Sequence, residues 1–246
     1  MKGIVEELLE GLPEGRDEIE DYDVGIRYVA VKLGSGRCGV AYRPPEAAFP
    51  ERSEVVGEDA LRAARWALSS DLGRRALGIA TINALTELSG PVRYGDPLDE
   101  LDARDKVIAM VGYFHPVERR FSGVAKEIRV VEREEVIRGR GLPNAFPPEK
   151  AGEALRGADI VVITGSALVY GGMEEYLELG RGASEVLVLG PTSSMNPKPF
   201  FRRGATIVGG VEIADPQALF SSPKECRDLF ASAARKIYFK RSDWAL

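Results

Sequence analysis

The sequence predicts an α/β protein, with an N-terminal α+β domain followed by a C-terminal domain built on a parallel sheet of about five strands. Two observations support this class. An alternating strand pattern and three helical patterns fill the first part of the chain, whereas short β-branched runs alternate with helical stretches in the rest. A turn-rich connection from Gly90-Pro91 to Gly95-Asp96-Pro97 separates these regions, so we expect domains at 1–100 and 101–246.

The N-terminal region begins with a predicted helix over 1–10, which ends at the breaker Gly11-Leu12-Pro13. Apolar residues then alternate from Val24 to Ala30 and from Cys38 to Tyr42, with a glycine-serine turn at 34–36, and this predicts a hairpin of two strands. Helical spacing follows at 58–69 and at 72–88. The second of these helices is apolar on nearly every side, which indicates burial between two layers.

Five β-branched runs in the C-terminal region predict the strands of a Rossmann-like sheet with crossover helices. In such a sheet, ligands bind beyond the carboxyl ends of the strands. The turns that follow each run are therefore the places to seek a site. The predicted strands are 107–111, 128–131, 160–164, 186–189 and 206–211.

Composition excludes several classes of protein. The net charge of -5, from 33 basic and 38 acidic residues, gives no attraction to nucleic acid or to an anionic membrane. No apolar run reaches the ~18 residues that span a bilayer, and the first ten residues lack the character of a signal peptide, so we expect a cytoplasmic protein. Its single glutamine and three asparagines are typical of a thermophilic source, and a homodimer is the default assembly.

Two neighbouring strands of the predicted sheet end in small, hydroxyl-rich turns. The first reads Thr164-Gly165-Ser166 and the second Gly190-Pro191-Thr192-Ser193. Glycine allows a ligand to approach the backbone, and free amides and hydroxyls at a helix start attract an anion. Residues of these types also serve as helix caps, but their occurrence at two adjacent strand ends favours a site for an anionic or polar ligand.

Other candidate binding residues follow the first two strands or lie in the apolar helix. Tyr113 and Phe114 can stack on a planar ligand or pack in the core, and His115, the only histidine, is an acid-base candidate or a structural residue. Glu132 occupies the position from which an acid contacts a ribose, or else belongs to a solvated charge cluster. Asn83 must find hydrogen-bond partners in its apolar surroundings. No glycine fingerprint follows the first strand, which disfavours NAD binding.

Four segments together resemble the putative heavy-metal chelation family. They are GIATINAL at 78–85, VGYFHP at 111–116, ADIVVITGSAL at 158–168 and VLVLGPTSSMNPKPFFRRGA at 186–205. The resemblance covers most of the chain. It implies an enolase N-terminal-like domain, a Rossmann-like domain, and a site in the cleft between them.

Two functional hypotheses follow, and the sequence leaves open whether catalysis accompanies either one. The first is a protein that binds a small anionic or polar molecule between its domains. The second, from the resemblance, is a metal-homeostasis protein without catalytic turnover. Cys38 and Cys226 are too far apart for a Cys-x-x-Cys pair, so a metal would require Cys38 or His115 to meet carboxylates across the cleft, or an organic chelator bound as the ligand.

Overall fold

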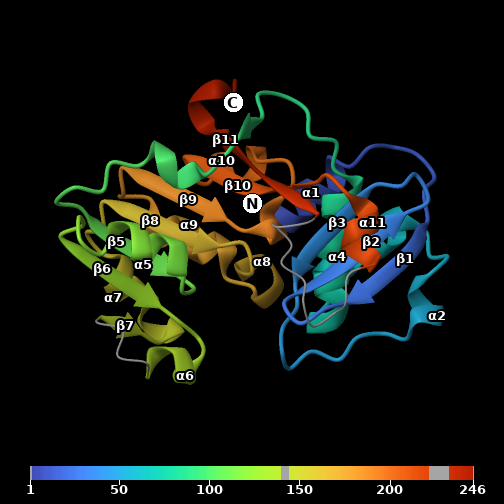
Figure 1. Ribbon diagram of the computed structural model, residues 1–246, viewed down its shortest axis with the longest axis horizontal. Helices are drawn as coiled ribbons and strands as arrows, with labels where there is room; N and C mark the ends of the chain where they lie inside the picture. Colours follow the sequence, from blue (N-terminus) through green and yellow to red (C-terminus); the bar gives the residue numbers. More distant parts are fainter. Residues whose placement is uncertain (1, 140–143, 222–232, 246) are drawn as a thin grey trace.

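The computed structural model describes residues 2–139, 144–221 and 233–245. It contains two sheets that lie side by side (Figure 1). A three-stranded antiparallel sheet, in the order β1-β2-β3, is formed by residues 19–42, and together with the helices between residues 4 and 85 we call it the N-terminal module. An eight-stranded, mostly parallel sheet, in the order β4-β11-β10-β9-β8-β5-β6-β7, belongs to the C-terminal module.

The small sheet has one strand more than the predicted hairpin. Its strands are β1 (Ile19–Val24), β2 (Tyr28–Leu33) and β3 (Cys38–Tyr42). The alternation from Val24 to Ala30, read as a single strand, is interrupted by a turn in which the Gly25 N–H donates to the Tyr28 carbonyl oxygen. The acidic stretch before Val24 hid β1, because Asp and Glu are depleted in strands although β1 buries Ile19 and Tyr22.

The predicted apolar helix is confirmed as α4 (Leu72–Leu85), and it is buried over most of its length. Two glycines make this packing possible. A Cβ on Gly39 would lie 2.2 Å from the Ala80 carbonyl oxygen, and one on Gly78 would lie 2.0 Å from the Ala67 nitrogen. Both strand β3 and the preceding helical segment therefore contact the α4 backbone directly.

The other N-terminal helices are short: α1 (Ile4–Glu10), α2 (Arg52–Val55) and α3 (Ala60–Ala64), which continues as a 3-10 turn over Arg65–Leu68. A regular helix over 58–69 would place Leu68 on the same face as Leu61 and Ala64, but Leu68 is 51% exposed. The change to 3-10 winding rotates the last residues, so that Ala67 is buried instead.

All five predicted strands of the large sheet are confirmed, as β5 (Val107–Val111), β6 (Glu127–Val131), β8 (Ile160–Thr164), β9 (Glu185–Leu189) and β10 (Ile207–Ile213). The expectation of about five strands was too low. Two-residue strands β4 (Arg93–Tyr94) and β7 (Ala145–Phe146) form the edges, and β11 (Ala234–Lys240) pairs antiparallel with β10 and β4. Charged residues interrupt the apolar pattern of β11 and concealed it.

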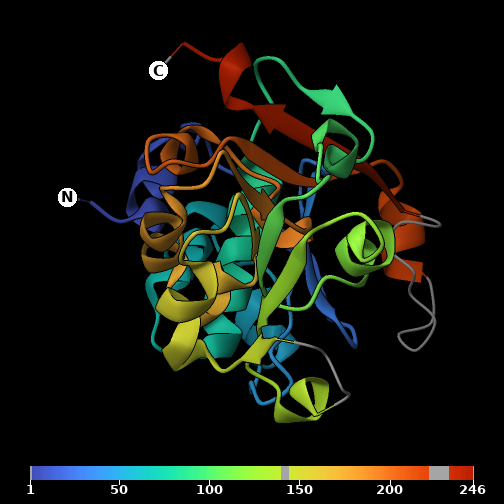
Figure 2. The ribbon, with the colours of Figure 1, turned by 90° about the vertical axis from the view of Figure 1, so that its left-hand side faces the viewer.

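Helices cover both faces of the large sheet (Figure 2). Side chains of α5 (His115–Phe121) pack on one face, and those of α7 (Ala151–Leu155), α8 (Ala167–Tyr170), α9 (Met173–Gly180) and α10 (Lys198–Phe201) pack on the other. The second face shares its core with α4 and the small sheet. Two short helices remain, α6 (Glu135–Arg138) and α11 (Pro216–Ser221).

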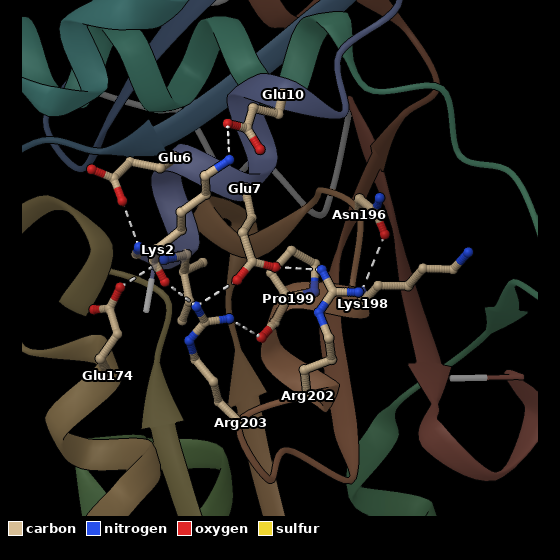
Figure 3. Close-up of polar contacts among 12 residues, drawn as sticks. Lys2, Glu6, Glu7, Glu10, Glu174, Asn196, Lys198, Pro199, Arg202 and Arg203 are labelled. Atoms are coloured by element: carbon tan, nitrogen blue, oxygen red, sulfur yellow. Dashed lines mark hydrogen bonds and ion pairs between the residues drawn. The ribbon is translucent and has the colours of Figure 1, made fainter.

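A cluster of charged groups fastens α1 to α10 (Figure 3). The Glu7 carboxylate accepts hydrogen bonds from Arg203, at 2.6 Å, and from Arg202. Arg203 also donates to the carbonyl oxygens of Lys2 and Pro199. The Arg203 guanidinium, and secondarily that of Arg202, holds the pKa of Glu7 below its ordinary value. The cluster therefore joins the two modules through an ionised carboxylate.

Candidate functional site at the carboxyl edge of the large sheet

The strand order reverses between β5 and β8, because β6 follows β5 on one side of the sheet and β9 follows β8 on the other. The turns after these two strands are in contact. Gly112 has a φ of 81°, and a Cβ there would lie 2.9 Å from the Thr164 Cγ2. Such a reversal is where ligands bind in doubly wound sheets.

The turn after β8 also meets the turn after β9. The Gly165 N–H donates to the Leu189 carbonyl oxygen at 2.8 Å, and a Cβ on Gly165 would lie 3.0 Å from the Ser193 Oγ. Gly112, Thr164, Gly165 and Ser193 thus form a continuous row along the carboxyl edge. The sequence predicted that these turns would converge, and the contacts show that they do.

The polar groups of the turn after β9 are already paired within the chain. The Thr192 Oγ1 accepts from the Tyr42 N–H at 2.9 Å, and the Ser193 Oγ lies 2.9 Å from the carbonyl oxygens of both Gly190 and Gly209. Both side chains are buried. The Ser193 hydroxyl holds the turn together and the Thr192 Oγ1 fastens it to β3, so both side chains have structural contacts, and anion binding at this turn stays a prediction. Pro191, in the same turn, is also buried.

Asn83 projects from α4 into this contact between modules. Its Nδ2 lies 2.7 Å from the Val40 carbonyl oxygen, 3.0 Å from that of Thr192 and 3.4 Å from that of Pro191. Three acceptors around one atom identify it as the amide nitrogen. The Oδ1 is consequently a buried acceptor, and it has no hydrogen-bond partner among the described residues. An unpaired buried acceptor is unfavourable unless a donor from outside the chain reaches it.

The hydroxyls that remain partly exposed are those of Thr164 and Ser166, whose oxygens are 3.0 Å apart. Close to this pair in the chain, at the end of α8, is Tyr170. Its ring lies 5.8 Å from that of Tyr42, and the Arg133 guanidinium lies 4.2 Å from its centroid.

Burial raises the pKa of both Tyr42 and Tyr170, so each is a neutral hydroxyl at physiological pH. Sequence reasoning missed Tyr42, Tyr170 and Arg133 as members of the site. They come from three separate segments, and no local pattern links them.

The residues after β5 and β6 mainly make contacts within the large sheet and the helix α5. The Glu132 carboxylate is 9% exposed and accepts from the N–H groups of Tyr113, at 2.9 Å, and Glu134, at 3.0 Å. The Glu132 carboxylate thereby links the turn after β5 to the turn after β6. Phe114 packs on the face opposite the small sheet, whereas His115 is exposed at the start of α5, edge-on to the Tyr113 ring.

The described residues do not fit a metal site built from side chains. Within residues 2–139, 144–221 and 233–245, no three His, Cys, Asp or Glu side chains are grouped to hold an ion. Burial raises the pKa of the Cys38 thiol to about 11, so it is protonated at neutral pH and a poor ligand. Cys226 lies outside the described residues.

Fold and site together define an α/β protein in which a small antiparallel sheet and its helices meet the carboxyl edge of a larger, mostly parallel sheet through polar contacts. The chain belongs to the family described as putative heavy-metal chelation: one model with this description matches residues 96–228, and a second matches residues 5–86. Residues 229–246 lie outside both ranges. Among curated proteins, none matches the chain.

Two solved structures of this family, both titled as proteins of unknown function, share the fold. One, from Desulfitobacterium hafniense, is 19% identical, with a TM-score of 0.81 over 96% of each chain. The other, from Pyrococcus horikoshii, is 22% identical, with a TM-score of 0.81 over 96% of this chain and 98% of that one.

None of the helices in the described part of the chain combines the length and the apolar character that a membrane span requires.

Proposed function

We propose that the protein binds a small polar molecule at the junction of its two modules, beside the reversal of strand order. The observation that carries this proposal is the Asn83 Oδ1, a buried acceptor with no donor among the described residues. A hydroxyl or N–H group of the bound molecule would supply that donor. The row of turns from Gly112 to Thr192 supports the location, because it runs from the strand reversal to Asn83.

The remaining contacts of the molecule follow from the groups that are still accessible. The Thr164 and Ser166 hydroxyls can donate to an oxygen of the ligand, and the exposed Arg133 guanidinium can pair with an anionic group. The rings of Tyr42 and Tyr170 offer apolar surface and neutral hydroxyls. A hydroxylated carboxylate or phosphate ester matches this combination of donors, one acceptor and a cation.

This function is compatible with the description of the family if the metal is carried by the bound molecule. Hydroxycarboxylates are themselves chelators, so an ion held by such a ligand would need no cluster of protein thiolates or imidazoles. We therefore favour an organic chelator, or its precursor, over direct coordination by Cys38 and His115.

The test is a thermal-unfolding screen of the full chain with hydroxycarboxylates and phosphate esters. Native mass spectrometry of the purified protein would identify any molecule that accompanies it. We expect Ser166→Ala and Arg133→Ala each to reduce the ligand-induced rise in Tm, whereas Ser122→Ala, at an exposed position after α5, leaves it unchanged. Equal rises in all three variants would refute the site.

Metal content separates the two functional hypotheses. We expect untagged protein to contain metal only together with a bound organic molecule. Stoichiometric metal that persists after organic ligands are removed, and that disappears in Cys38→Ser or His115→Ala, would contradict the proposal in favour of direct coordination.

A further inference from the structure

A pocket separate from the junction lies beside the segment that follows α4, and we call it the C-terminal pocket. It has a volume of about 170 Å³ and forms where the end of α1, the segment after α4, residues 195–197 and the last residues of the chain meet. It contains none of the junction residues described above. The apolar part of its wall includes Leu8, Leu12, Leu88, Met195, Phe239 and Trp244, and polar groups of Thr86, Glu87, Ser89 and Asn196 line the rest.

Trp244 is held rigidly in this wall. Its ring lies 5.9 Å from that of Phe239 and 6.2 Å from that of Phe201, and the Lys198 Nζ lies 5.5 Å from its centroid. Despite this packing, its Nε1–H is buried without a hydrogen-bond acceptor among the described residues. A buried indole N–H normally has a partner. The pocket therefore includes a fixed donor that the chain does not satisfy.

Asn196 supplies a second donor to the same pocket. Its Oδ1 accepts from the Lys198 N–H at 3.1 Å, which leaves the Nδ2 pointing away from that bond (Figure 3). The Nδ2 donates to none of the described residues, and it lies 3.8 Å from the position of a Cβ on Gly11, which also lines the pocket. Two donors thus accompany an apolar wall.

The charges nearby favour a neutral ligand. Glu87 is the only charged side chain among the described residues that line the pocket; it also pairs with Arg37 at 3.8 Å, and the Lys198 Nζ that contacts the Trp244 ring is not part of the lining. α1 ends in the pocket wall at Gly11, so that the partly negative end of the helix faces the same space. Both features oppose a carboxylate. An uncharged oxygen can accept from the two donors without this repulsion.

We propose that the C-terminal pocket binds a small, uncharged molecule with an apolar ring and a carbonyl or amide oxygen, which accepts hydrogen bonds from the Trp244 Nε1 and the Asn196 Nδ2. A cavity of roughly 150 Å³ is large enough to admit benzene, so a single substituted ring fits. The wall depends on Phe239 and Trp244, which lie beyond the residues matched by the family models. Binding here is independent of the junction between β3 and the turn after β9.

The experiment follows indole N–H signals of the ¹⁵N-labelled full chain by NMR during titration with benzamide. The chain has two tryptophans, and Trp244→Phe assigns their signals. We expect a saturable shift of the Trp244 signal and none of the Trp66 signal. Toluene, which lacks an acceptor, and benzoate, which is charged, should each bind roughly tenfold more weakly or worse.

Two variants test the geometry. Gly11→Leu places a side chain in the pocket and should abolish the benzamide shift, whereas Gly123→Leu, at a position with no heavy atom within 4 Å of a built Cβ, should preserve it. Asn196→Asp keeps the oxygen that caps Lys198 but removes the donor, and it should weaken binding by roughly three- to tenfold. Absence of a saturable shift, an unchanged shift in Gly11→Leu, or equal binding of toluene or benzoate would overturn the proposal.

Discussion

Replacement of Glu7 by glutamine tests how strongly the charged cluster between α1 and α10 fastens the modules. Arg203 is the partner that matters, because its side chain is only 10% exposed, whereas that of Arg202 is 50% exposed. Loss of a partner from a buried pair costs about 3–5 kcal/mol. Glu7 itself is 18% exposed, and Arg203 keeps two carbonyl acceptors, so we expect a smaller loss of about 2 kcal/mol. For a chain of this size that lowers Tm by roughly 4–8 °C.

The pH dependence of the stability difference between the wild type and Glu7→Gln gives a second test of the same reasoning. The pKa of Glu7 is lowered in the folded state, so its ionised form stabilises the protein above the ordinary carboxyl pKa. That contribution is lost as the pH falls through the lowered value. Thermal unfolding by circular dichroism should therefore show the wild-type and Glu7→Gln curves converging in acid. The reasoning is refuted if the gap stays constant from neutral pH to about pH 3, or if Arg202→Ala costs as much as Glu7→Gln.

Three further predictions concern packing, the thiol and heat stability. Gly39→Ala forces β3 away from the Ala80 carbonyl oxygen and should lower the free energy of unfolding in urea by about 3 kcal/mol or more. The control Gly182→Ala, at a position with no heavy atom within 4 Å of a built Cβ, should change it by no more than about 1 kcal/mol. Similar losses in the two variants would contradict the close packing of β3 on α4. In a Cys226→Ser variant, iodoacetamide at pH 8 should modify Cys38 roughly a hundredfold more slowly than it modifies a free thiol, because the thiolate is scarce. The rate of modification should rise as the pH approaches 11. Rapid modification at pH 8 would disprove the raised pKa. The scarcity of Gln and Asn predicts a Tm above about 65 °C, and calorimetry showing an ordinary mesophilic midpoint would count against it.

Much of the fold could be predicted because the large sheet has a strong local signal. Most of its central strands are buried on both faces and contain apolar, largely β-branched runs, although β6 carries Glu127 and Arg129 and is only partly buried at its start. The missed strands lack that signal. β1 carries acidic residues on its exposed face, and in β11 the charged residues Arg235, Lys236 and Lys240 flank a run of only three apolar residues. This composition disfavours a strand, and pairing with neighbouring strands determines both elements.

The candidate site was only partly predictable. The convergence of Thr164, Gly165 and Ser193 follows from strand order, which parallel crossovers restrict to few possibilities. Sequence alone does not reveal which polar atoms are left over after the modules pack. Thr192 looked like a ligand-binding hydroxyl because its partner, the Tyr42 N–H, is contributed by a strand 150 residues away.

The hydrogen bonds around Asn83 and Thr192 also limit how the proposed ligand could enter its site. If the two modules separated as rigid bodies, the bonds from the Asn83 amide to the Pro191 and Thr192 carbonyl oxygens and the bond from the Tyr42 N–H to the Thr192 Oγ1 would all break. Entry by that route would break several bonds at once, along with those of Glu7. Exchange with solvent should instead pass by the flank where Tyr170 and Arg133 face water, with rotation of a few side chains and no movement of whole domains.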